Sequence, residues 1–411
     1  MAPSTDQFKA ISVVDRHADT RTAALTIGDH LAESLGCSPS ATIVIASFHH
    51  AAALPEAISS IQGVLGPHPI LAATSCGVLA DGQEHHSGPT LAAFSFEGPG
   101  VRARSFRFDH RDGPPEAWSR TLVRSRLRPA SPPRLLFVMA DPFTAGSESV
   151  VRALDHATPA GTPIVGGLVT GGSQPGTNVF VTDDAVANSG AIGLVLEGDV
   201  VASPIIAHAG RAVGPALVVT GSDQNAVRQL NGRPAAQVFD ELLASLNNQD
   251  RTLLADRPVV GIVVDGHRTH LGRGDYLLRP MTTVDRNGGS LLLPGGVPRG
   301  STIRFQVIEG ATAREDLAMA LDLASLDERP VAGILAASSV GRGPQLLGET
   351  GHDAARLHER LDGVPLVGFV AAAEIGDIRG EPRLAGMGLS AVALRPSQKS
   401  HPREAGPVQP M

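Results

Sequence analysis

The segment Pro69-Ile-Leu-Ala-Ala-Thr-Ser-Cys-Gly77 has a pattern that returns twice, at Pro163-Ile-Val-Gly-Gly167 and at Pro365-Leu-Val-Gly-Phe369. In each case a proline precedes two aliphatic residues and then small residues. Proline lacks an N–H group and is therefore tolerated as the first residue of a strand. Glycine after a strand permits a positive φ or a close approach of two backbones. The pattern predicts three buried strands, each leading into a loop of small residues.

Each of these segments lies inside a longer repeat that consists of a strand, a helix, a second strand, a loop and a closing strand. The repeats are indicated by apolar runs and by apolar residues at helical spacing. They are expected at 42–96, 134–196 and 330–394, and a degenerate fourth begins near 258–265. Apolar strands alternating with helices are typical of sheets buried on both faces. Loops that follow such strands lie at the edge where α/β proteins bind ligands.

The chain of 411 residues is long enough for more than one domain, and 42% of its residues are hydrophobic, which indicates a packed interior. The predicted fold class is α/β, with two lobes built on mixed, largely buried β-sheets that helices cover. A region of different character, around a helix expected at 235–246, separates the second repeat from the third. The predicted organisation is an N-terminal segment with the first helix at 1–38, one lobe at 39–225, a second lobe at 226–395 and a disordered tail at 396–411.

Charge and composition argue against several classes of partner. The formal net charge is −7 and aromatic residues make up 3% of the chain, so no basic surface or stacking platform for nucleic acid is expected. The longest apolar runs, such as 331–340, are much shorter than a membrane span. The N-terminus lacks the apolar segment of a signal peptide. Two cysteines, Cys37 and Cys76, fit a reducing compartment. The sequence thus predicts a cytoplasmic protein without nucleic-acid or membrane partners.

Histidine pairs and an arginine cluster raise the question of a metal or phosphate site. Neighbouring residues of a strand point to opposite faces, so His49-His50 and His85-His86 each offer at most one ligand to a metal. Arginines gather between residues 120 and 128, where a solvated helix face is favoured over a phosphate site. No metal site and no cofactor are expected.

Several short motifs, taken in their order and spacing, resemble the FIST domain over roughly residues 42–395. FIST domains, with N-terminal and C-terminal halves, occur in bacterial sensory proteins and in a eukaryotic F-box protein. The motifs are Thr74-Ser-Cys-Gly77, Pro163-Ile-Val-Gly-Gly167, Gly193-Leu-Val-Leu-Glu197, Gln229-Leu-Asn-Gly-Arg-Pro-Ala235, Val307-Ile-Glu-Gly310, Ser338-Ser-Val-Gly-Arg342 and Gly368-Phe-Val-Ala-Ala-Ala-Glu-Ile375. The resemblance implies a signal-input module that binds a small ligand, amino acids being among the ligands proposed. It implies no established reaction.

The chain departs from the family at three places in its C-terminal half. The family usually has Cys-x-x-Arg or Cys-x-Gly-Arg where this chain has Ser339-Val-Gly-Arg342, so a hydroxyl replaces the thiol. The usual Gly-Glu pair is Ala373-Glu374, and the usual His-Asn-x-Thr is replaced by Ala385-Gly-Met-Gly-Leu389. These differences bear on any chemistry of that half and leave the scaffold unchanged. Kinase, cyclase or F-box output domains do not fit in this length, so the expected output partner is a separate signalling protein.

The predicted ligand site combines residues that follow the three buried strands. Its members are Cys76, Gly77, Gly166, Gly167, Ser339, Arg342 and Glu374. Arg342 can bind a carboxylate through two hydrogen bonds, and Glu374 can receive the amine of an amino-acid-like ligand. The alternative is an ion pair between Arg342 and Glu374. For Cys76 and the glycines, contact with a ligand competes with ordinary packing.

The leading hypothesis is a stand-alone FIST-type sensory module that binds a small-molecule ligand between or at the edge of the lobes and catalyses no reaction. Two alternatives stay open: a thiol- or serine-dependent enzyme at Cys76 or Ser339, and a protein-interaction adaptor. A hydrolase could use Ser75 or Cys76 with His49 and Asp81, but no G-x-S-x-G elbow fixes their geometry. The sequence does not determine the ligand, the output partner, the oligomeric state or the order of strands.

Overall fold

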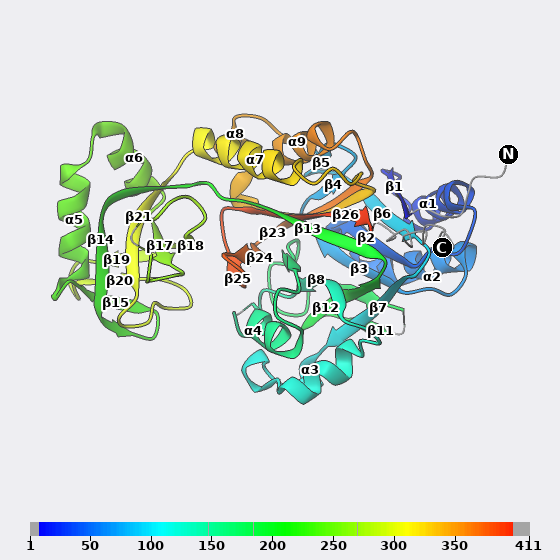
Figure 1. Ribbon diagram of the computed structural model, residues 1–411, viewed down its shortest axis with the longest axis horizontal. Coiled ribbons are helices and arrows are strands. Elements are labelled where there is room, and N and C mark those ends of the chain that lie inside the picture. Colours follow the sequence, from blue (N-terminus) through cyan, green and yellow to red (C-terminus); the bar gives the residue numbers. More distant parts are fainter. Residues whose placement is uncertain (1–7, 147, 184, 269, 398–411) are drawn as a thin grey trace, which may run out of the picture.

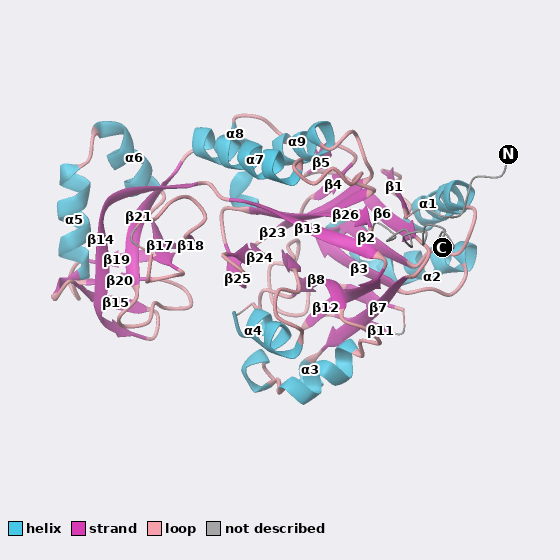
Figure 2. Ribbon diagram, in the orientation of Figure 1, coloured by secondary structure: helices cyan, strands magenta, loops and turns pink. Residues whose placement is uncertain are grey.

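The computed structural model describes residues 8–397 except 147, 184 and 269, and these residues form two bodies joined by long strands (Figure 1). Among them, the larger body contains three six-stranded sheets. The smaller body, residues 210–308, contains one eight-stranded sheet with the helices α5 (Ala235–Ser245) and α6 (Asn248–Asp256). Figure 2 shows helices on the outside of the sheets. The predicted α/β class with mixed sheets covered by helices is confirmed.

The three sheets of the larger body repeat one arrangement. In each sheet two parallel strands lie side by side, and a closing strand runs antiparallel along the first of them. The parallel pairs are β2 (Ala41–Ser47) with β3 (Ile70–Ser75), β8 (Pro133–Ala140) with β9 (Ile164–Leu168), and β22 (Gly333–Ser339) with β23 (Leu366–Ala371). The closing strands are β6 (Leu91–Glu97), β12 (Ala191–Gly198) and β26 (Leu389–Pro396). The sequence repeats are therefore three copies of one structural unit.

Each unit also gives a hairpin to the sheet of another unit. The hairpins are β4–β5 (Val78–Ala80, Gln83–His85), β10–β11 (Phe180–Thr182, Ala185–Ala187) and β24–β25 (Ala373–Ile378, Glu381–Ala385). The first unit's hairpin pairs with β23, the second's with β3 and the third's with β9. The exchange closes a ring of three, so none of the three sheets is complete without a strand from another unit.

The inward faces of the three sheets share one apolar core, to which each unit contributes a buried phenylalanine: Phe94, Phe137 and Phe369. The rings of Phe137 and Phe369 meet edge to face with centroids 6.3 Å apart. The outward faces are covered in turn by pairs of helices. These pairs are α1 (Thr20–Leu35) with α2 (Leu54–Leu65), α3 (Arg120–Leu127) with α4 (Glu148–Ala157), and α7 (Gly310–Ala324) with α9 (His352–Arg360).

One edge of each of the three sheets is formed by β1 (Lys9–Asp15), β7 (Val101–Phe108) or β13 (Val200–Ala207), and the other edge by an exchanged hairpin. The first of these lies within the segment for which only a helix was predicted. It pairs along its whole length with β6, from Lys9 opposite Glu97 to Asp15 opposite Leu91. A short strand whose neighbour lies about eighty residues further on has little local signal. Residues 398–411, most of the predicted tail, lie outside the described residues.

The smaller body is inserted between the second and third units. The chain enters it through β14 (Gly210–Asp223) and leaves through β21 (Thr302–Ile308), and these two strands pair with each other. Its other strands are β15 (Ala226–Leu230), β16 (Arg233–Pro234), β17 (Val259–Val263), β18 (Tyr276–Pro280), β19 (Thr283–Asp285) and β20 (Ser290–Leu292). The predicted boundary at 225/226 falls in the β14–β15 turn of this body. A division of the chain there stays a prediction.

None of the helices within the described ranges has the combination of length and apolar character that crossing a bilayer requires.

Candidate functional site

A cavity of about 670 Å³ lies where β22 ends, and both bodies contribute to its wall. The larger body supplies residues from the ends of β3 and β23 and from the turn η4 (Val340–Arg342) with α8 (Pro344–Leu347). The smaller body supplies Arg257 and Pro280. Of the predicted site residues, Cys76, Ser339 and Arg342 line this cavity. The loops that follow two of the repeated strands therefore meet at one hollow.

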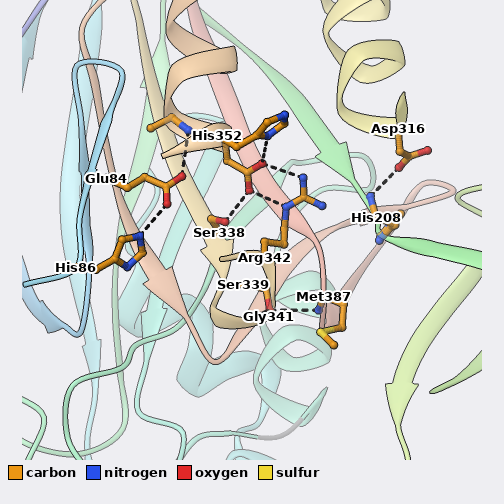
Figure 3. Close-up of polar contacts among 12 residues, drawn as sticks. Glu84, His86, His208, Asp316, Ser338, Ser339, Gly341, Arg342, His352 and Met387 are labelled. Atoms are coloured by element: carbon orange, nitrogen blue, oxygen red, sulfur yellow. Dashed lines mark hydrogen bonds and ion pairs between the residues drawn. The ribbon is translucent and has the colours of Figure 1, made fainter. Parts of the chain in front are cut away.

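Arg342 is held by a carboxylate that the sequence prediction missed. Its Nε and Nη2 donate to Asp353 at 2.6 and 2.8 Å, and both side chains are buried (Figure 3). Ser338 and His352 also contact this carboxylate. Burial opposes ionisation of Asp353, but the charge of Arg342 outweighs it and holds the pKa of Asp353 well below its usual range. The only hint in the sequence was an acidic residue in the first turn of the helix that follows.

One nitrogen of Arg342, Nη1, is buried and has no hydrogen-bond partner among the described residues. The ion pair with Asp353 fixes the plane of the guanidinium group and leaves this nitrogen for another acceptor. Beside the arginine, the Ser339 hydroxyl accepts from the backbone N–H of Gly341 and Met387, at 3.3 and 3.2 Å. The hydroxyl that replaces the family's thiol thus ties two loops of the cavity wall together.

The opposite wall carries a second carboxylate, Glu84. It pairs with the His86 ring at 3.0 Å and accepts from the backbone N–H of Ala354 at 3.3 Å (Figure 3). The hydrogen bond to Glu84 raises the pKa of His86. The lining of the cavity therefore includes one carboxylate, Glu84, and two arginines, Arg257 and Arg342.

Glu374 lies close behind the wall and does not line the cavity. Both of its carboxylate oxygens are buried without a hydrogen-bond partner in the part of the chain that is described. Burial raises its pKa to about 7, although the charge of Arg342 acts in the other direction. A Cβ added at Gly388 would lie 2.3 Å from Oε1 of Glu374, which shows how closely this loop covers the carboxylate. The predicted alternative of an Arg342–Glu374 ion pair is replaced by the pair of Arg342 with Asp353.

Cys76 is exposed rather than buried, at the point where the three repeated strands converge. The hydroxyl of Thr170, in the loop that follows β9, accepts from the Cys76 N–H at 3.1 Å. Ser75 donates to the carbonyls of Gly77 and Val370, at 2.7 and 3.0 Å. Gly77 has no room for a side chain, because a Cβ would lie 2.6 Å from Val370. These contacts fix the thiol at the cavity mouth.

Gly166 and Gly167 are strand residues and do not line the cavity. Gly166 has φ 138°, and a Cβ there would overlap the carbonyl oxygen of Val138 at 1.9 Å. At Gly167 a Cβ would lie 2.6 Å from the carbonyl oxygen of Ala373, on the strand received from the third unit. These two glycines permit the exchange of the hairpin between sheets. Their predicted contact with a ligand stays a prediction, and this cavity gives it no support.

His49 and Asp81, which the hydrolase alternative would use, contact different partners. His49 contacts the carbonyl of Ala18, and Asp81 contacts Ser12 and the backbone N–H of Leu366. Within the described ranges, no group of three or more His, Cys, Asp or Glu side chains is arranged to hold a metal ion.

The fold and the site define a two-body α/β protein with a cavity between its bodies, whose mainly apolar wall carries a few charged side chains. Family models identify it further: the FIST N domain matches residues 40–233 and the FIST C domain matches residues 235–377. The chain belongs to the FIST family, as the sequence motifs predicted. Domains of this family are generally ligand-binding domains of sensory and signalling proteins.

Relatives of the whole chain occur in mycobacteria. The uncharacterized protein MT0656 of Mycobacterium tuberculosis is 31% identical over 372 residues, which cover 90% of this chain and 94% of the relative. The uncharacterized protein Mb0898c of Mycobacterium bovis is 30% identical over the same shares. Among solved structures, cyanuric acid hydrolase from A. caulinodans matches 94% of this chain and 99% of its own, at 9% identity and a TM-score of 0.32. That likeness is too low to support an argument.

Proposed function

We propose that this chain is a sensory module that binds a small ligand in the cavity between its two bodies and passes the signal to a separate protein. The observation that supports this is the cavity itself, which joins loops after the repeated strands of the larger body to Arg257 and Pro280 of the smaller one. A ligand that contacts both bodies stabilises one arrangement of them, and such differential binding is what a sensor needs.

The charges around the cavity favour an amino-acid-like ligand. Arg257 can bind a carboxylate, the charge of Arg342 supports it, and Glu84 can bind an amine. Glu84 takes the role that the sequence prediction gave to Glu374. Arg342 is unsuitable for the first test, since replacing it leaves Asp353 buried without its partner.

A cavity-filling variant gives a cleaner test. Gly386 lines the cavity, and a Cβ there meets no atom within 4 Å, so Gly386→Leu places a side chain in the hollow without a clash at its root. Gly63→Leu is the matched control, because Gly63 is exposed on α2 and also has open space. A thermal-shift screen uses the twenty amino acids and small carboxylates. We expect a hit that stabilises the natural chain and the control by about 2.7 kcal/mol at one hundred times its Kd.

The same hit should not stabilise Gly386→Leu. If no amino acid or carboxylate shifts the unfolding temperature of the natural chain, or if Gly386→Leu responds equally, the proposal is wrong.

The two cysteines give an independent measurement. Cys76 lines the cavity and Cys37 does not, and both are exposed. A bound ligand should slow the reaction of iodoacetamide with Cys76 by tenfold or more and leave Cys37 unchanged. Protection of both thiols, or of neither, would argue against a ligand at this cavity.

A second candidate function, thiol chemistry at Cys76, is favoured by the position of His86. The His86 ring lies beside Gly77, and its Nδ1 is 2.9 Å from the position that a Cβ added at Gly77 would occupy. Its Nε2 pairs with the Glu84 carboxylate. A cysteine, a histidine and an orienting carboxylate are the parts of an activated thiol. For an enzyme, His86→Gln should slow alkylation of Cys76 at pH 7 by tenfold or more. For a binding module, the rate should stay within about twofold of the natural chain.

A further inference from the structure

The smaller body contains a second cavity, of about 230 Å³, which shares no lining residue with the first. It lies on the face formed by β14, β18 and β21, under the loop 271–274, and His208 closes it on the side of the larger body. Figure 3 shows His208 beside Asp316, with Arg342 on the neighbouring turn. The second cavity is thus separate from the one between the two bodies.

Three buried side chains in its wall have polar atoms without a hydrogen-bond partner among the described residues. They are both amide atoms of Gln306, the hydroxyl of Tyr276 and Nδ1 of His208. These residues are 1%, 5% and 7% exposed. An unpaired buried polar group costs about 1–3 kcal/mol, and three around one hollow are unusual for packing alone. Such a set is typical of a site that a polar ligand completes.

The charges of the wall indicate the sign of that ligand. Three arginines line the cavity and no aspartate or glutamate does. Arg211 is paired with Asp250 and Glu309, and Arg273 with Glu315. Arg304 bonds through Nε and Nη2 to the carbonyl of Gly214, a neutral group. An anion is therefore favoured, and an ammonium group is disfavoured because no carboxylate faces the cavity.

The neutral groups indicate what else the ligand carries. Gln306 offers an N–H and a carbonyl oxygen, and the oxygen needs a donor. Burial lowers the pKa of His208 and outweighs the nearby charge of Asp316, which acts in the other direction, so a neutral ring that can exchange hydrogen bonds with a hydroxyl is favoured. A hydroxyl satisfies these groups without adding positive charge.

We infer that this second cavity binds a small hydroxycarboxylate, whose carboxylate meets Arg304 and whose hydroxyl meets Gln306 and Tyr276. The inference does not depend on the function proposed for the first cavity.

The composition of the chain provides a direct probe. Tyr276 is the single tyrosine of the sequence, so a chain labelled with ¹³C-tyrosine gives its ring signals from this cavity alone. Trp118 is the single tryptophan and stacks on Phe108 in the larger body, where it serves as a distant reference. We expect sodium lactate to shift the Tyr276 signals in a saturable way, with a Kd of about 1 mM or below, and to leave the Trp118 signal unchanged.

Matched probes distinguish a specific site from general attraction of anions to the three arginines. Propionate, which lacks only the hydroxyl, should bind at least tenfold more weakly. Sodium chloride at the same ionic strength should have no effect. Gly386→Leu, which fills the first cavity, should respond to lactate like the natural chain.

Gln306→Met keeps the length and apolar stem of the side chain. Its affinity for lactate should be at least tenfold lower than that of the natural chain. Its Tyr276 signals without lactate report whether the smaller body is folded, and its Trp118 signal does so for the larger body. Tyr276→Phe keeps the ring, and calorimetry should show lactate binding reduced at least fivefold. An unshifted Tyr276 signal, an equal response to chloride or propionate, or full binding by both folded variants would overturn the inference.

Discussion

The first strands of the second and third units end at equivalent positions, but different side chains surround the two strand ends. Asp141 follows the first strand of the second unit, and Ser339 is the last residue of the first strand of the third. Each donates its backbone N–H to the carbonyl of the residue just before the closing strand, which is Gly190 in the second unit and Gly388 in the third. Asp141 is buried, and its partners among the described residues are neutral groups of Thr144 and Asn178. Its loop is thereby closed with its own hydrogen bonds.

The third unit has a serine at that position and an arginine three residues later. Its loop therefore depends on an ion pair between Arg342 and Asp353, at the start of α9. A single backbone arrangement thus gives a closed turn in one unit and an open cavity in another. The comparison shows that the side chains at the strand end differ between the two units, and that the third unit also has Arg257 and Pro280 of the smaller body beside it.

The largest expected effect is the loss of the partner of Arg342. Asp353→Asn leaves a buried guanidinium without its carboxylate and should lower the free energy of unfolding by about 4 kcal/mol. Asp141→Asn, the matched change in the second unit, removes a charge whose partners are neutral and should cost about 2 kcal/mol. Urea unfolding of both variants measures the difference.

The double variant Arg342→Met with Asp353→Leu tests whether the unpaired buried charge causes the loss of stability in Asp353→Asn. It removes both charges and should regain most of the stability that Asp353→Asn loses. Equal costs for the two single variants, or no recovery in the double variant, would contradict this view of the third unit.

A smaller effect concerns the dependence of stability on pH. Burial raises the pKa of Glu374 to about 7 from an ordinary 4.5, so between these values the folded chain keeps a proton that the unfolded chain has lost. The contribution of Glu374 to stability is therefore complete below pH 4.5, falls as the pH rises to 7 and is constant above it, a change of about 3 kcal/mol.

Glu374→Gln should lack this decline. The quantity to measure is the difference in the free energy of unfolding between the natural chain and the variant from pH 4.5 to 8. A difference that does not change with pH would show that Glu374 ionises in the folded chain as it does in water.

The smallest expected effect concerns the serine hydroxyls at the strand ends of the first and third units. The Ser47 hydroxyl accepts from the N–H of Thr90 at 3.0 Å, as the Ser339 hydroxyl accepts from that of Met387. Ser47→Ala and Ser339→Ala should each cost about 1 kcal/mol. Costs that differ by more than about 1 kcal/mol would show that the two strand ends are not equivalent. Ser339→Cys, which restores the family's thiol, should lie between alanine and serine.

The three repeats could be predicted from the amino-acid sequence alone. Proline at 69, 163 and 365, followed by aliphatic and small residues, predicted the inner strands because apolar runs of this length need burial on both faces. It also predicted that Cys76, Ser339 and Arg342 lie near one another, since loops after such strands share an edge.

Only the tertiary structure decided how the repeats combine and which charges meet. The exchange of hairpins depends on pairing between strands up to about three hundred residues apart, for which local pattern gives no signal. The same holds for Arg342, whose partner could have been Glu374 or Asp353 on charge alone. Geometry selects Asp353, because its carboxylate faces the guanidinium fork while Glu374 is left unpaired behind the wall.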